Sequence, residues 1–140
     1  MNNFILEIHT IEKTTYKDQA TRITLPTIDG QITVLANHLP VITALAPGEM
    51  TYDDYKGLHC VFISGGFAEI QGRRIIILAN LVENPEDLQE HIVEKEIEIA
   101  RKRAEELKKN GAENKAIESA SVDLMLATSK LRFIRRRRHI

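Results

Sequence analysis

Five histidines and one cysteine are the residues of this 140-residue chain best suited to hold a metal or act as nucleophiles, but their spacing supports neither role. No two histidines have His-x3-His spacing, and Cys60 has no second cysteine to form a pair, so the sequence predicts no metal site. Because Cys60 lies in an apolar run, we expect it to be a small core residue. The histidines are His9, His38, His59, His91 and His139.

Catalytic motifs are absent or incomplete in this sequence. The Ser-Gly-Gly segment at residues 64–66 contains half of a nucleophile elbow, but Phe62 stands where that motif needs glycine. We interpret the segment as a tight bend at which strands approach closely. His9, His59 and Glu69 fall on expected strands and could form an acid-base set, although single polar residues on the solvent side of a strand are commoner. The sequence therefore predicts no catalytic residue, and it has no Gly-rich phosphate loop.

The first 84 residues have the pattern of β-strands. Apolar and polar residues alternate at 22–25 and 31–35, residues 4–11 are rich in strand formers, and the apolar runs at 61–64 and 75–78 are typical of strands covered on both faces. Short strands with evenly spaced turns predict an all-β sandwich of about ten strands. The turn signals, which contain Gly, Asn or Pro, are Asp29-Gly30, Asn37-His38, Pro47-Gly48, Lys56-Gly57, Gly65-Gly66 and Gln71-Gly72.

Residues 85–140 have the pattern of helices instead. Asn84 and Pro85 form a helix start, and Gly111 marks a stop between two apolar stripes, which predicts an antiparallel helical hairpin. Small residues dominate the second stripe and bury little area, so we expect the hairpin to be weakly held and mobile. The first stripe is Leu88, Ile92, Val93, Ile97, Ala100, Ala104 and Leu107, and the second is Ala116, Ile117, Ala120, Leu124, Ala127, Leu131 and Ile134.

The formal net charge of −1 conceals an uneven distribution of charge. Residues 83–106 are rich in glutamate, whereas residues 130–138, here called the cation segment, carry six Lys or Arg residues and no acid. The cation segment could contact an acidic protein, nucleic acid or anionic lipid, or be solvated. Only Phe133 is nearby for base stacking, so we favour an acidic protein partner. The six cations are Lys130, Arg132, Arg135, Arg136, Arg137 and Arg138.

Several motifs, taken in order, resemble the epsilon subunit of the bacterial and plastid rotary ATP synthase. The most specific are Asn-His-Leu-Pro at residues 37–40 and Ile-Ser-Gly-Gly-Phe at residues 63–67, and Asp-Gly at 29–30, Pro-Gly at 47–48 and Ile-Leu-Ala at 77–79 follow the same order. The likeness covers residues 5–80 and continues more loosely through the hairpin at 118–120 and 130–132. The layout of a sandwich followed by a hairpin agrees with it.

The resemblance implies a non-catalytic rotor subunit of a proton-translocating ATP synthase. The sandwich would lie at the foot of the gamma subunit and contact the c-ring. The hairpin would fold against the sandwich or extend toward the alpha and beta subunits, where it restrains ATP hydrolysis and the cation segment meets an acidic segment of beta. Asn37 replaces a common Gly, and Gln31 replaces a common Glu that could contact the ring. The implied interface residues are Gln31, Asn37, His38, Leu39, Pro40, Thr43 and Ser64.

Some members of that family bind regulatory ATP through an Ile/Leu-Asp-x-x-Arg-Ala motif in the first helix. Residues 88–93 lack its Asp, Arg and Ala, and a shifted alignment over residues 97–102 supplies only Glu98 and Arg101 as nucleotide contacts. We therefore predict no cofactor.

The rotor subunit is the leading hypothesis, with gamma, the c-ring, alpha and beta as partners and with no nucleic acid. No apolar run approaches the roughly 20 residues that cross a bilayer. The start lacks export or import features. We therefore expect membrane association only through the complex, at the cytoplasmic face of a bacterial inner membrane or the stromal side of a thylakoid.

The alternative is a free-standing basic-tailed binding module for RNA or anionic lipid, whose affinity would fall steeply with salt. A third hypothesis, a small enzyme with a cleft in the sandwich, needs convergent titratable groups that the sequence does not supply.

Overall fold

The computed structural model of the chain describes residues 2–138. His139 and the side chain of Arg138, which the sequence analysis named, lie outside the described residues. The chain divides into two compact units, Met1–Pro85 and Glu86–Ile140. No helix in the described part is long and apolar enough to span a membrane.

The first unit is a β-sandwich, as predicted, but it has eight described strands rather than about ten. The count is lower because two strands are 17 and 16 residues long and each serves both layers of the sandwich. The strands are β1 (Phe4–His9), β2 (Thr14–Ala20), β3 (Arg22–Thr27), β4 (Gly30–Leu35), β5 (His38–Asp54), β6 (Gly57–Gly72), β7 (Arg74–Ala79) and β8 (Val82–Glu83).

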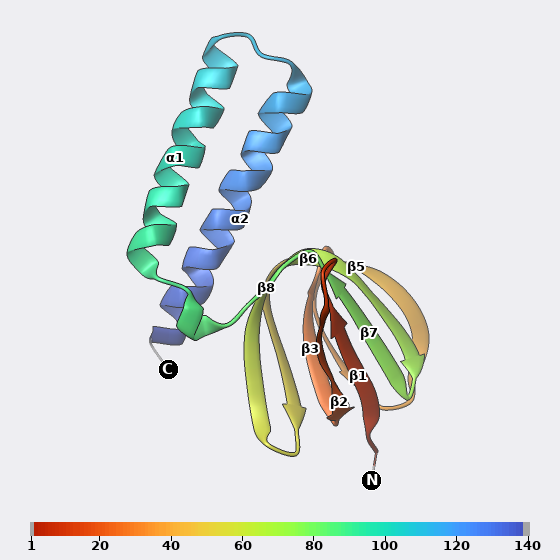
Figure 1. The fold of residues 1–140 in the computed structure, drawn as a ribbon. Helices are drawn as coiled ribbons and strands as arrows, with labels where there is room; N and C mark the ends of the chain where they lie inside the picture. Colours follow the sequence, from red (N-terminus) through yellow and green to blue (C-terminus); the bar gives the residue numbers. More distant parts are fainter. Residues whose placement is uncertain (1, 139–140) are drawn as a thin grey trace. The chain divides into compact units, whose positions relative to one another are not determined.

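The strand order is β2-β1-β7-β6-β5-β3-β4, and β8 pairs with β6. Among the described strands, the pairing of β1 with β7 is parallel and the other pairings are antiparallel. In the half of the long β5–β6 hairpin away from its tip, β6 pairs with β7 on its free side. In the half near the tip, β5 pairs with β3 on its free side. The sheet therefore folds over on itself within the two long strands (Figure 1).

The bend in β6 lies at the Ser-Gly-Gly segment, as the sequence predicted. Gly65 and Gly66 have φ values of 107° and 135°, which L-residues rarely adopt. A Cβ on Gly66 would lie 2.0 Å from the backbone oxygen of Leu78, so no side chain fits there. The turn predicted at Pro47-Gly48 is wrong, because both residues continue β5 opposite this bend.

The sandwich core is formed by alternate residues of the strands. Leu6 in β1, Ile23 in β3 and Ile75 in β7 are all fully buried in it. Cys60 was predicted to join this core, and that prediction is wrong. Its neighbour Val61 points inward, so Cys60 points to the opposite face, where its thiol lies 2.9 Å from Glu49 Oε1.

The second unit is the predicted antiparallel pair of helices, α1 (Glu90–Lys109) and α2 (Asn114–Arg138), preceded by a short 3-10 turn, η1 (Pro85–Asp87) (Figure 1). The helix start predicted at Asn84-Pro85 forms only η1, and α1 begins five residues later with Gln89 as N-cap. The stop is as predicted, because Gly111 has φ 69°.

The hairpin core is smaller than that of the sandwich. It consists of buried Val93, Ile97 and Ala127, with half-buried Leu124, Leu131 and Ile134 packed against them. Two residues of the predicted stripes are exposed instead: Ile92 is 45% exposed, and Ala116 is exposed in the first turn of α2. In α2 the buried residues are Ala120, Ala127 and Phe133, so two of its three buried side chains are small, and the weak packing expected of the hairpin stays a prediction.

Candidate functional site

An exposed apolar surface lies on the outward face of β5, β6 and β7. Phe67 pairs across strands with Leu78, and in the next row Ile42 and Ile76 lie on either side of Glu69. Ile42, Phe67 and Leu78 are 72%, 57% and 53% exposed, whereas their inward neighbours Ala68 and Ile77 are fully buried. We call Ile42, Phe67, Ile76 and Leu78 the outer apolar patch. Such a contiguous apolar area on a strand face is typical of a protein-protein contact.

The sequence contained an indirect signal for this patch. The apolar run at 75–78 is the pattern of a strand covered on both faces, yet only one face of β7 is covered within the sandwich. Ile75 and Ile77 fill the core, and Leu78 faces outward. The sandwich itself therefore leaves the outward side chains of β7 exposed or half-buried.

A buried ionic network adjoins the outer apolar patch. Glu7 pairs in register with Ile76, and its carboxylate accepts hydrogen bonds from Arg74 at 2.6 Å. His9 Nε2 lies 3.1 Å from the other Glu7 oxygen, and His9 Nδ1 lies 2.9 Å from the Thr14 hydroxyl. The hydrogen bond from Arg74 holds the pKa of Glu7 below its usual value, against the opposing effect of desolvation. Glu7 therefore stays charged beside the patch.

Four of the interface residues implied by the resemblance lie together. Asn37, with φ 67°, precedes β5, and its amide donates to the Gly72 carbonyl at 2.8 Å. His38, Leu39 and Pro40 open β5 and are exposed, Leu39 at 80%. Asparagine tolerates this left-handed geometry, so its replacement of glycine leaves the loop intact.

The other three implied interface residues lie elsewhere. Gln31 is exposed on β4 opposite Pro26. Thr43 pairs with buried Ala68 and thus points to the inward side of β5, opposite to the patch. Ser64 lies at the β6 bend opposite Pro47, roughly 25 Å along β5 from Leu39 at ~3.3 Å per residue.

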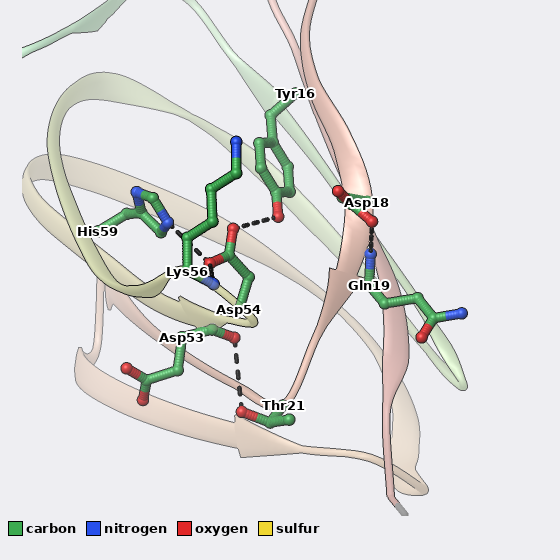
Figure 2. A network of polar contacts seen from close by, with 8 residues as sticks. All are labelled: Tyr16, Asp18, Gln19, Thr21, Asp53, Asp54, Lys56 and His59. Atoms are coloured by element: carbon green, nitrogen blue, oxygen red, sulfur yellow. Dashed lines mark hydrogen bonds and ion pairs between the residues drawn. The ribbon is translucent and has the colours of Figure 1, made fainter.

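A second polar network surrounds Asp54 (Figure 2). The Tyr16 hydroxyl of β2 donates to Asp54 Oδ2 at 2.9 Å, and the Lys56 amide donates to Oδ1 at 2.8 Å. His59 Nε2 lies 2.8 Å from the same Oδ1, and its ring stacks on Tyr52 at 4.9 Å. Asp54 thus fastens the β5–β6 tip to β2, the end strand that lies four places from β5 in the strand order.

Hydrogen bonding and burial act in opposite directions on Asp54. Desolvation raises the pKa of Asp54, but hydrogen bonds from His59, Lys56 and Tyr16 outweigh it and hold this pKa below its usual value. Burial and the neighbouring Asp54 carboxylate raise the pKa of Tyr16. The sequence suggests His9, His59 and Glu69 as a possible acid-base set, but each has its own partner. His9 lies beside Glu7, His59 lies beside Asp54, and Glu69 accepts a hydrogen bond from Gln71.

The cation segment does not form one continuous patch, because a helix turns its side chains about 100° per residue. Arg132, Arg135 and Arg136 line a shallow groove with Thr128 and Leu131. Lys130 lines a second groove between α1 and α2, together with Glu96 and Asp123. Arg137 lies 5.9 Å from the Phe133 ring centre.

The two residues suggested as nucleotide contacts pair with each other. Arg101 lies 3.4 Å from Glu98, one turn away on α1, and both side chains are 53% exposed. Within residues 2–138, no three His, Cys, Asp or Glu side chains lie close enough together to hold a metal ion.

The sandwich matches a known protein family. Residues 3–85 match the model described as ATP synthase, Delta/Epsilon chain, beta-sandwich domain. The ATP synthase epsilon chain of Desulfosudis oleivorans is 39% identical over 104 residues, which are 74% of this chain and 78% of that one. The chain belongs to the ATP synthase epsilon-chain family. Epsilon chains are non-catalytic subunits of the synthase, which agrees with a chain whose polar networks are structural.

The likeness to epsilon chains extends through the hairpin. The epsilon chain of Propionigenium modestum, named as sodium ion specific, is 32% identical over 99% of this chain and 98% of its own length. A chain of the Euglena gracilis mitochondrial ATP synthase, solved as OSCP, F1 and c-ring, has the same fold, with a TM-score of 0.78 at 21% identity. That match covers 92% of this epsilon chain and 79% of the other.

Proposed function

We propose that this epsilon chain is a central-stalk subunit of a proton-translocating ATP synthase. Its sandwich joins the gamma subunit to the c-ring, and its hairpin restrains ATP hydrolysis by the alpha and beta subunits. It associates with the membrane only through the complex, at the cytoplasmic face of a bacterial membrane or the stromal side of a thylakoid.

The outer apolar patch is the observation that carries this proposal. Phe67 and Leu78 are more than half exposed, and the strand that carries Leu78 has the continuous apolar sequence that is typical of a strand covered on both faces. Arg74, which is bonded to buried Glu7 and is 54% exposed, offers a charged group at the border of the patch, around an apolar centre, as is usual in protein interfaces. We assign this face to the gamma subunit.

The loop at residues 37–40 is assigned to the c-ring. Leu39 is the most exposed aliphatic side chain there, at 80%, and the left-handed Asn37 fixes the direction in which the loop leaves the sheet. One chain of the Tetrahymena thermophila mitochondrial ATP synthase, solved as central stalk and c-ring, shares the fold over 60% of this chain and 68% of its own, with a TM-score of 0.52 at 15% identity.

The hairpin is assigned to the restraint of hydrolysis. Its small core makes opening inexpensive, and its cation segment offers arginine side chains to an acidic segment of the beta subunit. No cofactor is included in the proposal, because Glu98 and Arg101 bind each other and the remaining nucleotide motif is replaced.

Hydrolysis of ATP by the purified catalytic complex tests the roles assigned to the sandwich and the hairpin. The full-length chain is expected to bind and slow hydrolysis, and a form ending at Pro85 is expected to bind without slowing it. Absence of binding by either form would contradict the rotor assignment.

Coupled proton pumping by the reconstituted complex, measured with and without Na+, tests which ion the complex translocates, since one relative is named sodium ion specific.

Substitution of the outer apolar patch tests the gamma assignment. Phe67→Ser with Leu78→Ser leaves the core untouched, and we expect it to weaken binding to gamma at least tenfold, or ~1.4 kcal/mol, as for a central interface pair. Leu58→Ser is the matched control, since Leu58 is 65% exposed on the same strand near the hairpin tip. Equal affinity for both variants would place the gamma contact elsewhere.

A further inference from the structure

One arginine and two glutamates hold the open end of the hairpin. Arg135 Nε donates to Glu90 Oε1 at 3.0 Å, and Arg135 Nη2 donates to Glu94 Oε1 at 3.2 Å. Arg135 lies in the last turn of α2, Glu90 is the first residue of α1, and Glu94 lies one turn later. The connecting turn is at the other end of the hairpin (Figure 1), so this side chain joins the helices where the backbone does not.

The positions of the three charges favour this contact. Glu90 and Glu94 are four residues apart on one helix face and repel each other unless a cation lies between them. The start of α1 favours acids and the end of α2 favours cations, and the antiparallel arrangement brings these two ends together. Hydrogen bonding to Glu90, and then to Glu94, raises the pKa of Arg135. We call Glu90, Glu94 and Arg135 the clasp.

We propose that the clasp keeps the hairpin closed and withholds Arg135 from an acidic protein partner, so that intramolecular and intermolecular carboxylates compete for one guanidinium. This inference rests on the proposed function, in which the cation segment meets an acidic surface. Arg132 is exposed in the same groove as Arg135 and would meet the partner first. Arg135 then joins the partner only when the clasp opens, which couples hairpin opening to binding.

The clasp is weak enough to act as a switch. Its side chains are 55%, 24% and 49% exposed for Arg135, Glu90 and Glu94, so solvent and salt screen the pairs. An exposed ion pair shifts an equilibrium by roughly 1.5- to 5-fold. In a hairpin with so small a core, a shift of that size changes the population of the open form directly.

Hydrogen exchange of the isolated full-length chain tests closure without any partner. Glu90→Gln with Glu94→Gln, and separately Arg135→Gln, are expected to accelerate exchange of the α1 and α2 amides roughly two- to fivefold. Because all three residues form one contact, the triple variant should add no further acceleration. The matched control is Glu98→Gln with Arg101→Gln, which removes an ion pair within α1 and should leave exchange nearly unchanged.

Inhibition of ATP hydrolysis by the catalytic complex tests the competition. The variant with both glutamates replaced keeps all six cations and opens more readily, so it should inhibit at a roughly two- to fivefold lower concentration. Arg135→Gln opens equally readily but loses a partner contact, so it should inhibit less than the glutamate variant. The two variants therefore agree in exchange and differ in inhibition.

Each outcome of the two experiments decides a different point. Unchanged exchange in both clasp variants overturns the clasp. Faster exchange with identical inhibition by the two variants overturns the competition for Arg135. If the wild-type chain does not slow hydrolysis at all, the proposed function fails, and the exchange experiment still decides whether the clasp holds the hairpin closed.

Discussion

One glycine and one aspartate fix the course of the long β5–β6 hairpin in the sandwich. Gly66 permits β6 to cross from one layer to the other, because its φ of 135° and its closeness to Leu78 exclude any side chain. Asp54 fastens the far end of the same hairpin by accepting from Tyr16 and the Lys56 amide. Gly66 thus permits the bend in β6, and Asp54 fixes the tip of the β5–β6 hairpin against β2.

Gly66→Ala is expected to destabilise the sandwich severely, by roughly 3–5 kcal/mol in urea unfolding, because it adds both backbone strain and a steric clash. Gly30→Ala is the control, since Gly30 has a similar φ of 119° but nothing within 4 Å of an added Cβ. That variant should lose only about 1–2 kcal/mol from strain. Equal losses would show that the clash at Leu78 is relieved by movement of β7.

Tyr16→Phe is expected to lower the melting temperature near pH 6 by about 5 °C through loss of the hydrogen bond to Asp54. The folded pKa of Asp54 lies below its unfolded value of 3.8, so its contribution is present above that pH and is lost as pH falls through the folded pKa. The wild type should therefore lose more stability below pH ~4 than Tyr16→Phe does.

Melting curves between pH 2.5 and pH 6 measure this difference. Tyr55→Phe is the control, because it removes a hydroxyl from a side chain that is 76% exposed. Parallel pH profiles for wild type and Tyr16→Phe would contradict the role given to the Asp54 network.

At the scale of elements, strands and helices differ in how clearly the sequence marks them. The alternation in β3 and β4 and the apolar run in β7 predicted those strands directly. Strand β2 has no such pattern, because it is an edge strand with almost all of its side chains exposed. In α1, spacing identified Val93 and Ile97 as buried but also included Ile92, which is 45% exposed.

Ile97→Ala is expected to unfold much of the hairpin, because removing a buried isoleucine costs roughly 2–5 kcal/mol and the hairpin core has few other members. Ile99→Ala is the matched control two residues away, where the side chain is 69% exposed and the change should stay within about 0.5 kcal/mol. Helical circular dichroism and exchange of the α1 amides report the difference. Similar behaviour of both variants would contradict the burial assigned to Ile97.

At the scale of the whole molecule, the two units differ in the size of their cores. The sandwich buries residues from seven of the described strands in one cluster, whereas the hairpin core centres on Val93, Ile97 and Ala127. Such a difference permits one unit to serve as a stable anchor while the other opens at small cost.

Hydrogen exchange of the full chain is expected to separate the two units. Amides of α1 and α2 should exchange at least ~100-fold faster than those of β1, β6 and β7, because opening the hairpin exposes far less buried surface. Equal protection in both units would contradict the mobile hairpin and, with it, the proposed restraint of hydrolysis.

The sequence by itself determined the two-part layout, the helical hairpin and the loop at Asn37, because strand period, helix period and left-handed turn residues are local properties. Only the tertiary structure decided which face of each strand is covered. Phe67 and Leu78 meet on one exposed face although they are eleven positions apart, and Thr43 points away from Ile42. It also decided that Arg135 meets Glu90 and Glu94, which lie 45 and 41 positions away in the sequence, because that contact depends on how the two helices pack.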